Sequence, residues 1–254
     1  MSRLLQDSKN FGPKVSTITK LVAEAKSLLS SANYLPENTL TASTLCRDEL
    51  NQRAIDQLVT SWGPIFNLSG LAGIPSAGNT AFAAFSHHVE REKGKLLIIH
   101  GPHIGQSADG VWGEVKRDRM GSSSTACGSL CLALKQIAGE LPPPSTANSY
   151  GGPESDWEQW VVYQSLYDQL QANKLDRALS ITEATSLMSQ IIHLQVEQRR
   201  RQAIPNECKV AILGGVWINT PHLNDDFFAP HYFSAEVEGE EQKINLLDQL
   251  NSSL

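Results

Sequence analysis

Two unbroken apolar runs limit the folds available to this chain more than any other feature. They are Lys95-Leu-Leu-Ile-Ile-His100, which Gly101-Pro102 follows at once, and Lys209-Val-Ala-Ile-Leu-Gly-Gly-Val-Trp-Ile218. Apolar runs without polar alternation are typical of strands buried on both faces, as in a parallel sheet. A short strand is also predicted over residues 40–45, and an edge strand over 231–238. The chain is therefore expected to build a sheet that is covered on both sides.

Segments with apolar residues at helical spacing lie between these strands. They predict helices that cover the two faces of the sheet. Helices are predicted over 15–32, 48–62, 80–88, 126–139, 156–173 and 181–203; loops are predicted over 66–78, 105–113 and 141–153. Strands that alternate with helices predict an α/β fold with a central, mostly parallel sheet flanked by helices. The second half has too few strands for a sheet of its own. We expect one domain over 1–254, with an N-terminal helical arm at 1–38 and the α/β core at 39–254.

Composition excludes several classes of protein. The net charge of −6 argues against a nucleic-acid binder, which needs a basic face. No apolar run approaches the roughly 20 residues that span a bilayer, so no membrane association is expected. The first residues lack the apolar stretch of a signal peptide. Four cysteines are too few for a disulfide framework and fit a reducing compartment. We expect a cytoplasmic protein, or an organellar one if a transit peptide has been trimmed.

Soft metal ligands stand where three predicted elements begin or end. Cys46 follows the first predicted strand, His103 follows the second, and Cys127 lies at the start of the fourth predicted helix. A helix N-terminus favours the thiolate form of a cysteine. The carboxyl ends of parallel strands gather at one edge of a sheet. Two thiolates and one imidazole form a zinc-binding set, and three protein ligands leave the fourth position open for water.

Spacing alone does not select this set, because the chain has no short ligand motif such as CxxC. Cys131, four residues after Cys127, is a rival ligand, and with it the site could be closed and purely structural. Cysteines also occur simply as small buried apolar residues. A further alternative is a cysteine hydrolase, with Cys127 as the nucleophile and His103 as its base.

Motifs in the first half of the chain resemble a known family. In order along the chain they are Cys46-Arg-Asp-Glu-Leu50, Trp62-Gly-Pro-Ile-Phe-Asn-Leu-Ser-Gly-Leu-Ala-Gly73, Gly101-Pro-His-Ile-Gly105 and Ser124-Thr-Ala-Cys-Gly128. Together they resemble the limiting-CO2-inducible protein B (LCIB) family, the theta-type carbonic anhydrases. The resemblance implies a fold similar to beta-carbonic anhydrases, a homodimer, and Zn²⁺ bound by two cysteines and one histidine. Mapped onto this chain, these ligands fall on Cys46, His103 and Cys127.

The resemblance also implies an activity, the reversible hydration of CO2 to bicarbonate by zinc-bound hydroxide. Asp48 is expected to be catalytic and to orient the hydroxide, although it could instead occupy the fourth zinc position. In the beta class this aspartate pairs with an arginine two residues later, but here that residue is Leu50. Arg47 is taken as the catalytic arginine, with Arg117 and Arg119 as alternatives. The departure at Leu50 favours another hypothesis, a catalytically silent zinc-binding homologue that acts as a subunit or bicarbonate-responsive partner in inorganic-carbon handling.

Overall fold

The fold, seen in a computed structural model, is built around one mixed sheet. The structure describes residues 8–90, 93–145, 156–172, 179–221, 225–240 and 242–254. The main sheet has eight strands in the order β1-β9-β8-β4-β2-β3, while β5 adds to β8 and β10 to β9. Strands β3, β2, β4, β5 and β8 run parallel to one another, and β9 is antiparallel to β8. The strands are β1 (Ser16–Thr17), β2 (Thr39–Leu45), β3 (Ile65–Asn67), β4 (Lys95–Gly101), β5 (His103–Gly105), β8 (Lys209–Asn219), β9 (Phe227–Ala235) and β10 (Ile244–Asn245), with a separate hairpin of β6 (Glu114–Lys116) and β7 (Ser123–Thr125).

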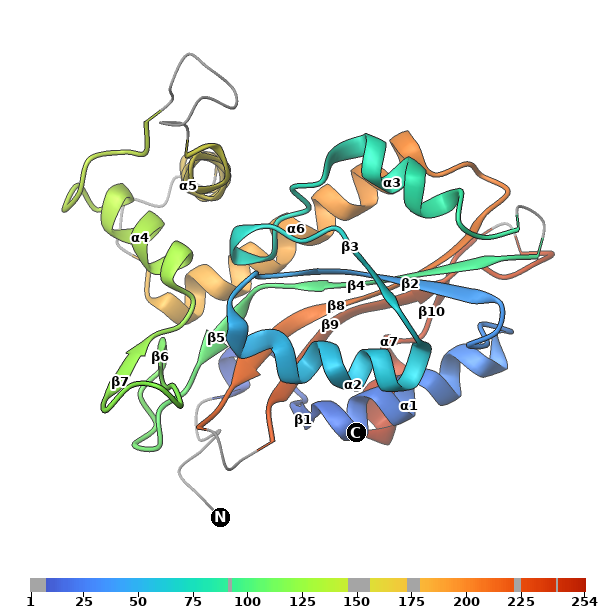
Figure 1. The fold of residues 1–254 in the computed structure, drawn as a ribbon, viewed down its shortest axis with the longest axis horizontal. Coiled ribbons are helices and arrows are strands. Elements are labelled where there is room, and N and C mark those ends of the chain that lie inside the picture. The colour runs from blue at the N-terminus through green and yellow to red at the C-terminus, as the bar shows by residue number, and fades with distance from the viewer. Residues whose placement is uncertain (1–7, 91–92, 146–155, 173–178, 222–224, 241) are drawn as a thin grey trace.

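Helices cover both faces of this sheet (Figure 1). The helices are α1 (Ile18–Ser31), α2 (Gln52–Trp62), α3 (Gly78–Ser86), α4 (Gly128–Ile137), α5 (Trp157–Ala172), α6 (Ile181–Ala203) and α7 (Leu247–Ser253), with short 3-10 turns η1 (Ser8–Phe11), η2 (Glu49–Asn51) and η3 (Leu71–Gly73). Helices α3 and α6 lie over one face, and α4 and α5 pack against α6 toward the end of the sheet near β5; we call these four helices the upper layer. Helices α1, α2 and α7 pack on the other face, the lower layer.

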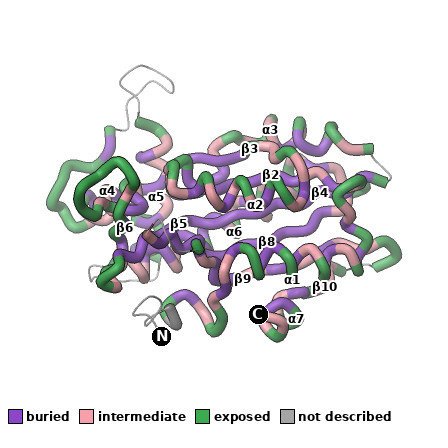
Figure 2. Tube along the Cα trace, turned by 60° about the horizontal axis from the view of Figure 1, so that its bottom comes forward, coloured by how far each residue is buried: buried purple, intermediate pink, exposed green. Residues whose placement is uncertain are grey.

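Strand β4 shows why the sheet needs two layers. Its side chains alternate, so that Leu96 and Ile98 enter the upper core while Leu97 and Ile99 enter the lower one. All four are fully buried, and burying each contributes about 1.5–3 kcal/mol relative to exposure. In Figure 2 the central strands are buried along their length, whereas the helices expose their outer faces. The predicted α/β class, with a mostly parallel sheet flanked by helices, is confirmed.

The N-terminal segment packs on the rest of the chain. Thr17 caps α1 by accepting a hydrogen bond from the Lys20 backbone, and α1 buries its apolar face in the lower layer. Strand β1 pairs with the start of β9.

No helix among the described residues is long and apolar enough to cross a membrane.

Three details differ from the sequence-based expectations. The glycine-rich stretch 66–78 was expected to be a loop, but it overlaps β3, which is too short to show a periodic pattern and depends on pairing with β2. The hairpin β6–β7 was not predicted. The expected edge strand 231–238 is β9, which begins earlier and is not at an edge, because β8 lies on one side and β1 and β10 on the other. Most of the predicted loop at 141–153 lies outside the described residues.

Candidate metal centre

The carboxyl ends of the parallel strands bring the candidate ligands together. Cys46 follows the last residue of β2, and His103 begins β5 just beyond β4. The backbone around Cys46 is fixed by Asn51, whose Nδ2 donates to the Cys46 carbonyl oxygen at 3.0 Å. Ser69 closes the end of β2, because its Oγ accepts from the Leu45 amide at 3.2 Å and donates to the Ser43 carbonyl oxygen.

Gly101-Pro102 separates β4 from β5, and this break in the strand positions His103. Gly101 has a φ of +151°, and a Cβ atom there would lie 1.9 Å from the Gly215 carbonyl oxygen. Only glycine permits such a close approach of two backbones. After the break, β5 continues beside β8, with His103 opposite Trp217.

Cys127 stands at the start of α4 as its N-cap residue. Its carbonyl oxygen accepts the hydrogen bond from the Cys131 amide at 3.1 Å, which begins the helix. Its extended backbone, with φ −88° and ψ 127°, places the side chain before the first helical turn. Cys131, one turn later, is only partly buried and lies outside the ligand group found among the described residues.

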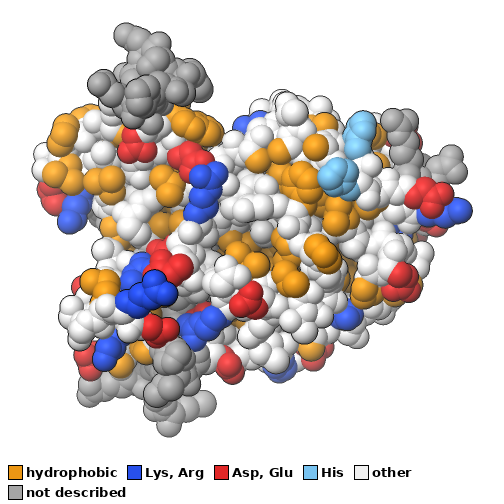
Figure 3. All heavy atoms as spheres, viewed as in Figure 1, with side chains coloured by type: hydrophobic (Ala, Val, Ile, Leu, Met, Phe, Trp, Pro, Cys, Tyr) orange, Lys and Arg blue, Asp and Glu red, His pale blue; other side chains and the backbone are white. Residues whose placement is uncertain are grey.

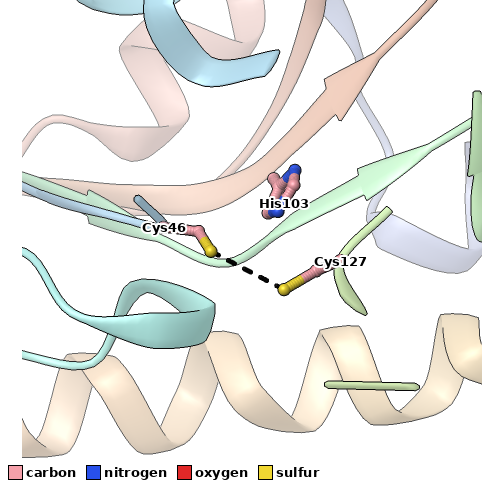
Figure 4. Close-up of side chains that lie close together, drawn as sticks. All are labelled: Cys46, His103 and Cys127. Atoms are coloured by element: carbon pink, nitrogen blue, oxygen red, sulfur yellow. Dashed lines mark hydrogen bonds between the residues drawn. The ribbon is translucent and has the colours of Figure 1, made fainter. Parts of the chain in front are cut away.

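Cys46, His103 and Cys127 converge from three separate segments (Figure 4). Their ligand atoms all lie within 4.8 Å of one another, and the two Sγ atoms are 3.7 Å apart. The exposed fractions of the three residues are 5%, 0% and 1%. A buried group of two thiols and an imidazole has the donor types that zinc prefers.

Asn219, the last residue of β8, fixes the tautomer of His103. Its Nδ2 donates to the Leu50 carbonyl oxygen at 3.2 Å, so its Oδ1 faces His103 Nδ1 at 2.6 Å. Because this oxygen can only accept, Nδ1 of the neutral ring carries the proton and Nε2 keeps its lone pair. Nε2 is buried and has no hydrogen-bond partner among the residues that the structure describes. A free, buried nitrogen beside two thiols fits a metal ligand whose other nitrogen is held by a hydrogen bond. Sequence reasoning did not identify Asn219, and no local pattern marks it.

Asp48 and Arg117 form an ion pair at the solvent side of this group. Arg117 donates to both carboxylate oxygens of Asp48, at 2.8 and 2.9 Å. Asp48 Oδ2 lies 3.8 Å from His103 Nε2. The hairpin holds Arg117 in place, since the guanidinium also donates to Ser124 Oγ and to the Thr125 carbonyl oxygen, each at 3.0 Å. The side chains of Asp48 and Arg117 are 12% and 17% exposed, so they lie between the buried ligands and solvent.

The other residues named from the sequence lie differently. The Arg47 guanidinium donates to the Ser69 carbonyl oxygen and pairs with Glu158 at 2.9 Å, and its side chain is 56% exposed. Arg119 is exposed. Leu50 contributes two backbone hydrogen bonds to the site. Its amide donates to Asp48 Oδ1 at 3.1 Å, and its carbonyl oxygen accepts from Asn219 Nδ2. Among these arginines, the structure pairs Asp48 with Arg117, and a catalytic role for Arg47 stays a prediction.

Hydrogen bonds and burial shift the pKa values of Cys46, Cys127 and Asp48. The hydrogen bond from Cys127 lowers the pKa of Cys46 to about 4, against the opposite effect of burial. The same contact, with burial, raises the pKa of Cys127. Burial raises the pKa of Asp48, but the hydrogen bonds from Arg117, the nearby His103 and the hydrogen bond from the Leu50 amide together outweigh it and lower the value to about 2. The two thiols thus share one proton, which a metal cation would replace because it binds thiolates.

Fold and site together define a class, a mixed α/β protein with a buried Cys-His-Cys group that could hold a metal ion. The sequence profile of the limiting CO2-inducible proteins B/C beta carbonic anhydrases matches residues 15–237. The chain therefore belongs to this family, as the four motifs had indicated. No curated protein sequence matches the chain significantly.

Solved structures agree with this assignment. PtLCIB4, a homolog of the limiting CO2-inducible protein LCIB, is 27% identical; the match covers 94% of this chain and 97% of that chain, with a TM-score of 0.79. The limiting CO2-inducible protein LCIB itself has the same fold at 23% identity, over 96% of this chain and 100% of that chain, with a TM-score of 0.77.

Proposed function

We propose that this protein is a zinc-dependent carbonic anhydrase that catalyses the reversible hydration of CO2 to bicarbonate. The observation that carries the proposal is the Asp48–Arg117 pair beside the buried ligand group, with Asp48 Oδ2 at 3.8 Å from His103 Nε2. A metal site that only stabilised the fold would need no charged pair at its solvent side. The family to which the chain belongs carries carbonic anhydrases in its name.

Cys46, His103 and Cys127 would hold the zinc ion, because they supply two thiolate sulfurs and one nitrogen with its lone pair free. Zinc with three protein ligands supplies Lewis acidity, which lowers the pKa of a coordinated water molecule toward about 7. The chain's own contribution is to hold these donors in place. Asn219 orients the His103 ring, and Asn51 fixes the backbone of Cys46.

Asp48 would act as a hydrogen-bond acceptor that orients the attacking oxygen. Its pKa of about 2 keeps it ionised at neutral pH, and an ionised carboxylate can only accept hydrogen bonds. Arg117 donates to both oxygens of this carboxylate and fixes its direction. The same bidentate contact opposes movement of Asp48 into the ligand group, which favours an open fourth position over an aspartate-closed one.

CO2 is apolar and needs an apolar wall next to the ligands. Leu68 is fully buried and belongs to the core cluster that contains Cys46 and Cys127, with Leu71 packed against that cluster. Phe66, from the same glycine-rich stretch, packs instead on Phe85 with ring centroids 5.5 Å apart. Leu68 and Leu71 are therefore the better candidates. Each CO2 hydrated releases one proton, which a surface histidine or buffer would carry away.

Two alternatives can be weighed against the same contacts. The catalytically silent homologue was favoured by Leu50 in place of an arginine, but Arg117 supplies a guanidinium to Asp48 from another part of the chain. The cysteine hydrolase needs an accessible nucleophile, whereas Cys127 is 1% exposed and its pKa is raised by Cys46 and by burial. Neither alternative explains the charged pair better than the carbonic anhydrase does.

Stopped-flow CO2 hydration by the zinc-loaded protein tests the proposal. We expect turnover well above that of buffer, a large loss in Asp48→Asn and in Arg117→Met, and unchanged zinc content in both variants. Arg119→Met, which changes an exposed arginine of the same segment, is the control and should keep full activity. A zinc-loaded wild-type protein without turnover would refute the enzyme and favour the silent homologue.

The assembly and location expected from the sequence also remain proposals. The family resemblance supports a homodimer, which light scattering during size-exclusion chromatography would test. In the described structure none of Cys46, Cys127, Cys131 and Cys208 forms a disulfide, which fits a reducing compartment such as the cytoplasm.

A further inference from the structure

A cavity away from the metal centre lies between α5, α6 and the segment after η3. Its volume is about 220 Å³, and it is lined by Ile74, Pro75, Ser76, Trp157, Val161, Gln195, Gln198 and Arg199. Figure 3 shows the molecular surface hollowed between the α5 side and the α3 side. None of these residues belongs to the metal-ligand group, so the cavity is a separate feature of the molecule.

The two walls of the cavity differ in chemistry. Ile74, Pro75, Trp157 and Val161 form an apolar wall, while Ser76, Gln195, Gln198 and Arg199 supply polar groups. Trp157 is 37% exposed, unusually open for so large an apolar side chain. Small-molecule sites combine an apolar lining with a few polar groups that fix orientation in this way.

Arg199 gives the cavity a positive charge without a negative partner. Its Nη1 donates to Asn79 Oδ1, a neutral acceptor, at 2.9 Å. Among the described residues, no carboxylate lies within ion-pair distance of Arg199, whereas its neighbours on α6 are paired, Arg200 with Glu236 and Arg201 with Glu197. Arg199 lines the cavity, so an anion bound there would supply the missing charged partner.

We propose that this cavity is a binding site for small monocarboxylates with an apolar body, of the size of benzoate. The carboxylate accepts hydrogen bonds from the Arg199 guanidinium, which is suited to planar carboxylates. The apolar body packs against Trp157 and Val161. Ser76 lines the cavity and also accepts a hydrogen bond from Arg47 at 3.4 Å, so an occupied cavity would adjoin the residue that follows Cys46.

Calorimetric titration of the full-length, zinc-loaded chain with benzoate tests the site. Benzoate is expected to bind. Benzamide has the same shape without the charge and should bind at least tenfold more weakly. Acetate lacks the apolar body and should also bind more weakly than benzoate. Arg199→Met should weaken benzoate binding about tenfold or more, because it removes a charged hydrogen-bond partner. Arg201→Met, on the same helix but outside the cavity, is the matched control and should leave benzoate binding unchanged.

Benzoate could instead bind the zinc ion, and two further measurements separate these cases. Binding should persist after zinc is removed by a chelator, and it should quench a tryptophan signal that disappears in Trp157→Phe. The proposal is overturned if benzoate fails to bind, if benzamide binds as well as benzoate, if Arg199→Met leaves binding unchanged, or if binding is lost with zinc. None of these readouts depends on carbonic anhydrase activity.

Discussion

The two helical layers bury similar apolar side chains, yet only the upper one contains the metal-ligand group. In the lower layer, α1, α2 and α7 pack on the sheet through aliphatic and aromatic residues such as Leu29 and Trp62. In the upper layer, Cys46 and Cys127 belong to the core cluster itself. The change happens within one step of the chain, because Leu45 points into the lower core and Cys46 into the upper one. Stability is thus shared by both layers, while the proposed chemistry is confined to the strand ends beneath α4.

The largest expected effect comes from removing a ligand in the upper layer. Cys127→Ala leaves only two of the three ligands, so we expect zinc to fall from about one ion per chain to almost none. Zinc per chain is measured by elemental analysis after dialysis in metal-free buffer. Cys131→Ala, one helical turn away and outside the ligand group, should retain zinc. Equal zinc loss in both variants would mean that Cys131 is also a ligand and that the site is closed.

A cavity in the lower layer should separate stability from metal binding. Leu29 is fully buried in α1, so Leu29→Ala should lower the unfolding free energy by about 2–5 kcal/mol. Denaturant titration measures this loss, and zinc per folded chain should stay at the wild-type level. Leu194→Ala, at a position that is 61% exposed, is the control and should change stability by less than about 0.5 kcal/mol. Zinc loss in folded Leu29→Ala would show that the two layers are not independent.

A smaller effect is expected from the residue that orients a ligand. Asn219→Ala removes the acceptor of the His103 Nδ1 proton, so zinc affinity should fall about 10- to 100-fold. Competition with a chromophoric chelator measures this affinity. Asn79→Ala, which changes an exposed asparagine of α3 that contacts Arg199, should leave the affinity as it is. An unchanged affinity in Asn219→Ala would remove Asn219 from the proposed metal centre.

The sequence by itself determined the fold class and the places where metal ligands could gather. Apolar runs specify buried strands through local hydrophobicity, and β4 and β8 lie where those runs are. Cys46 and His103 follow predicted strands, and Cys127 begins a predicted helix. Each of the three positions could therefore be found from its own surroundings, without knowing what lies opposite in space.

Only the tertiary structure decided which side chains complete the group. Arg117 is 69 residues from Asp48, and Asn219 is 116 residues from His103. Nothing in the local sequence distinguishes Arg117 from Arg119, or Asn219 from another strand-end residue. Strand β3, at the end of the sheet order, also forms only by pairing with β2. Hydrophobic periodicity is a property of neighbouring residues, whereas a hydrogen-bond partner depends on how distant segments meet, and that contact exists only in the folded chain.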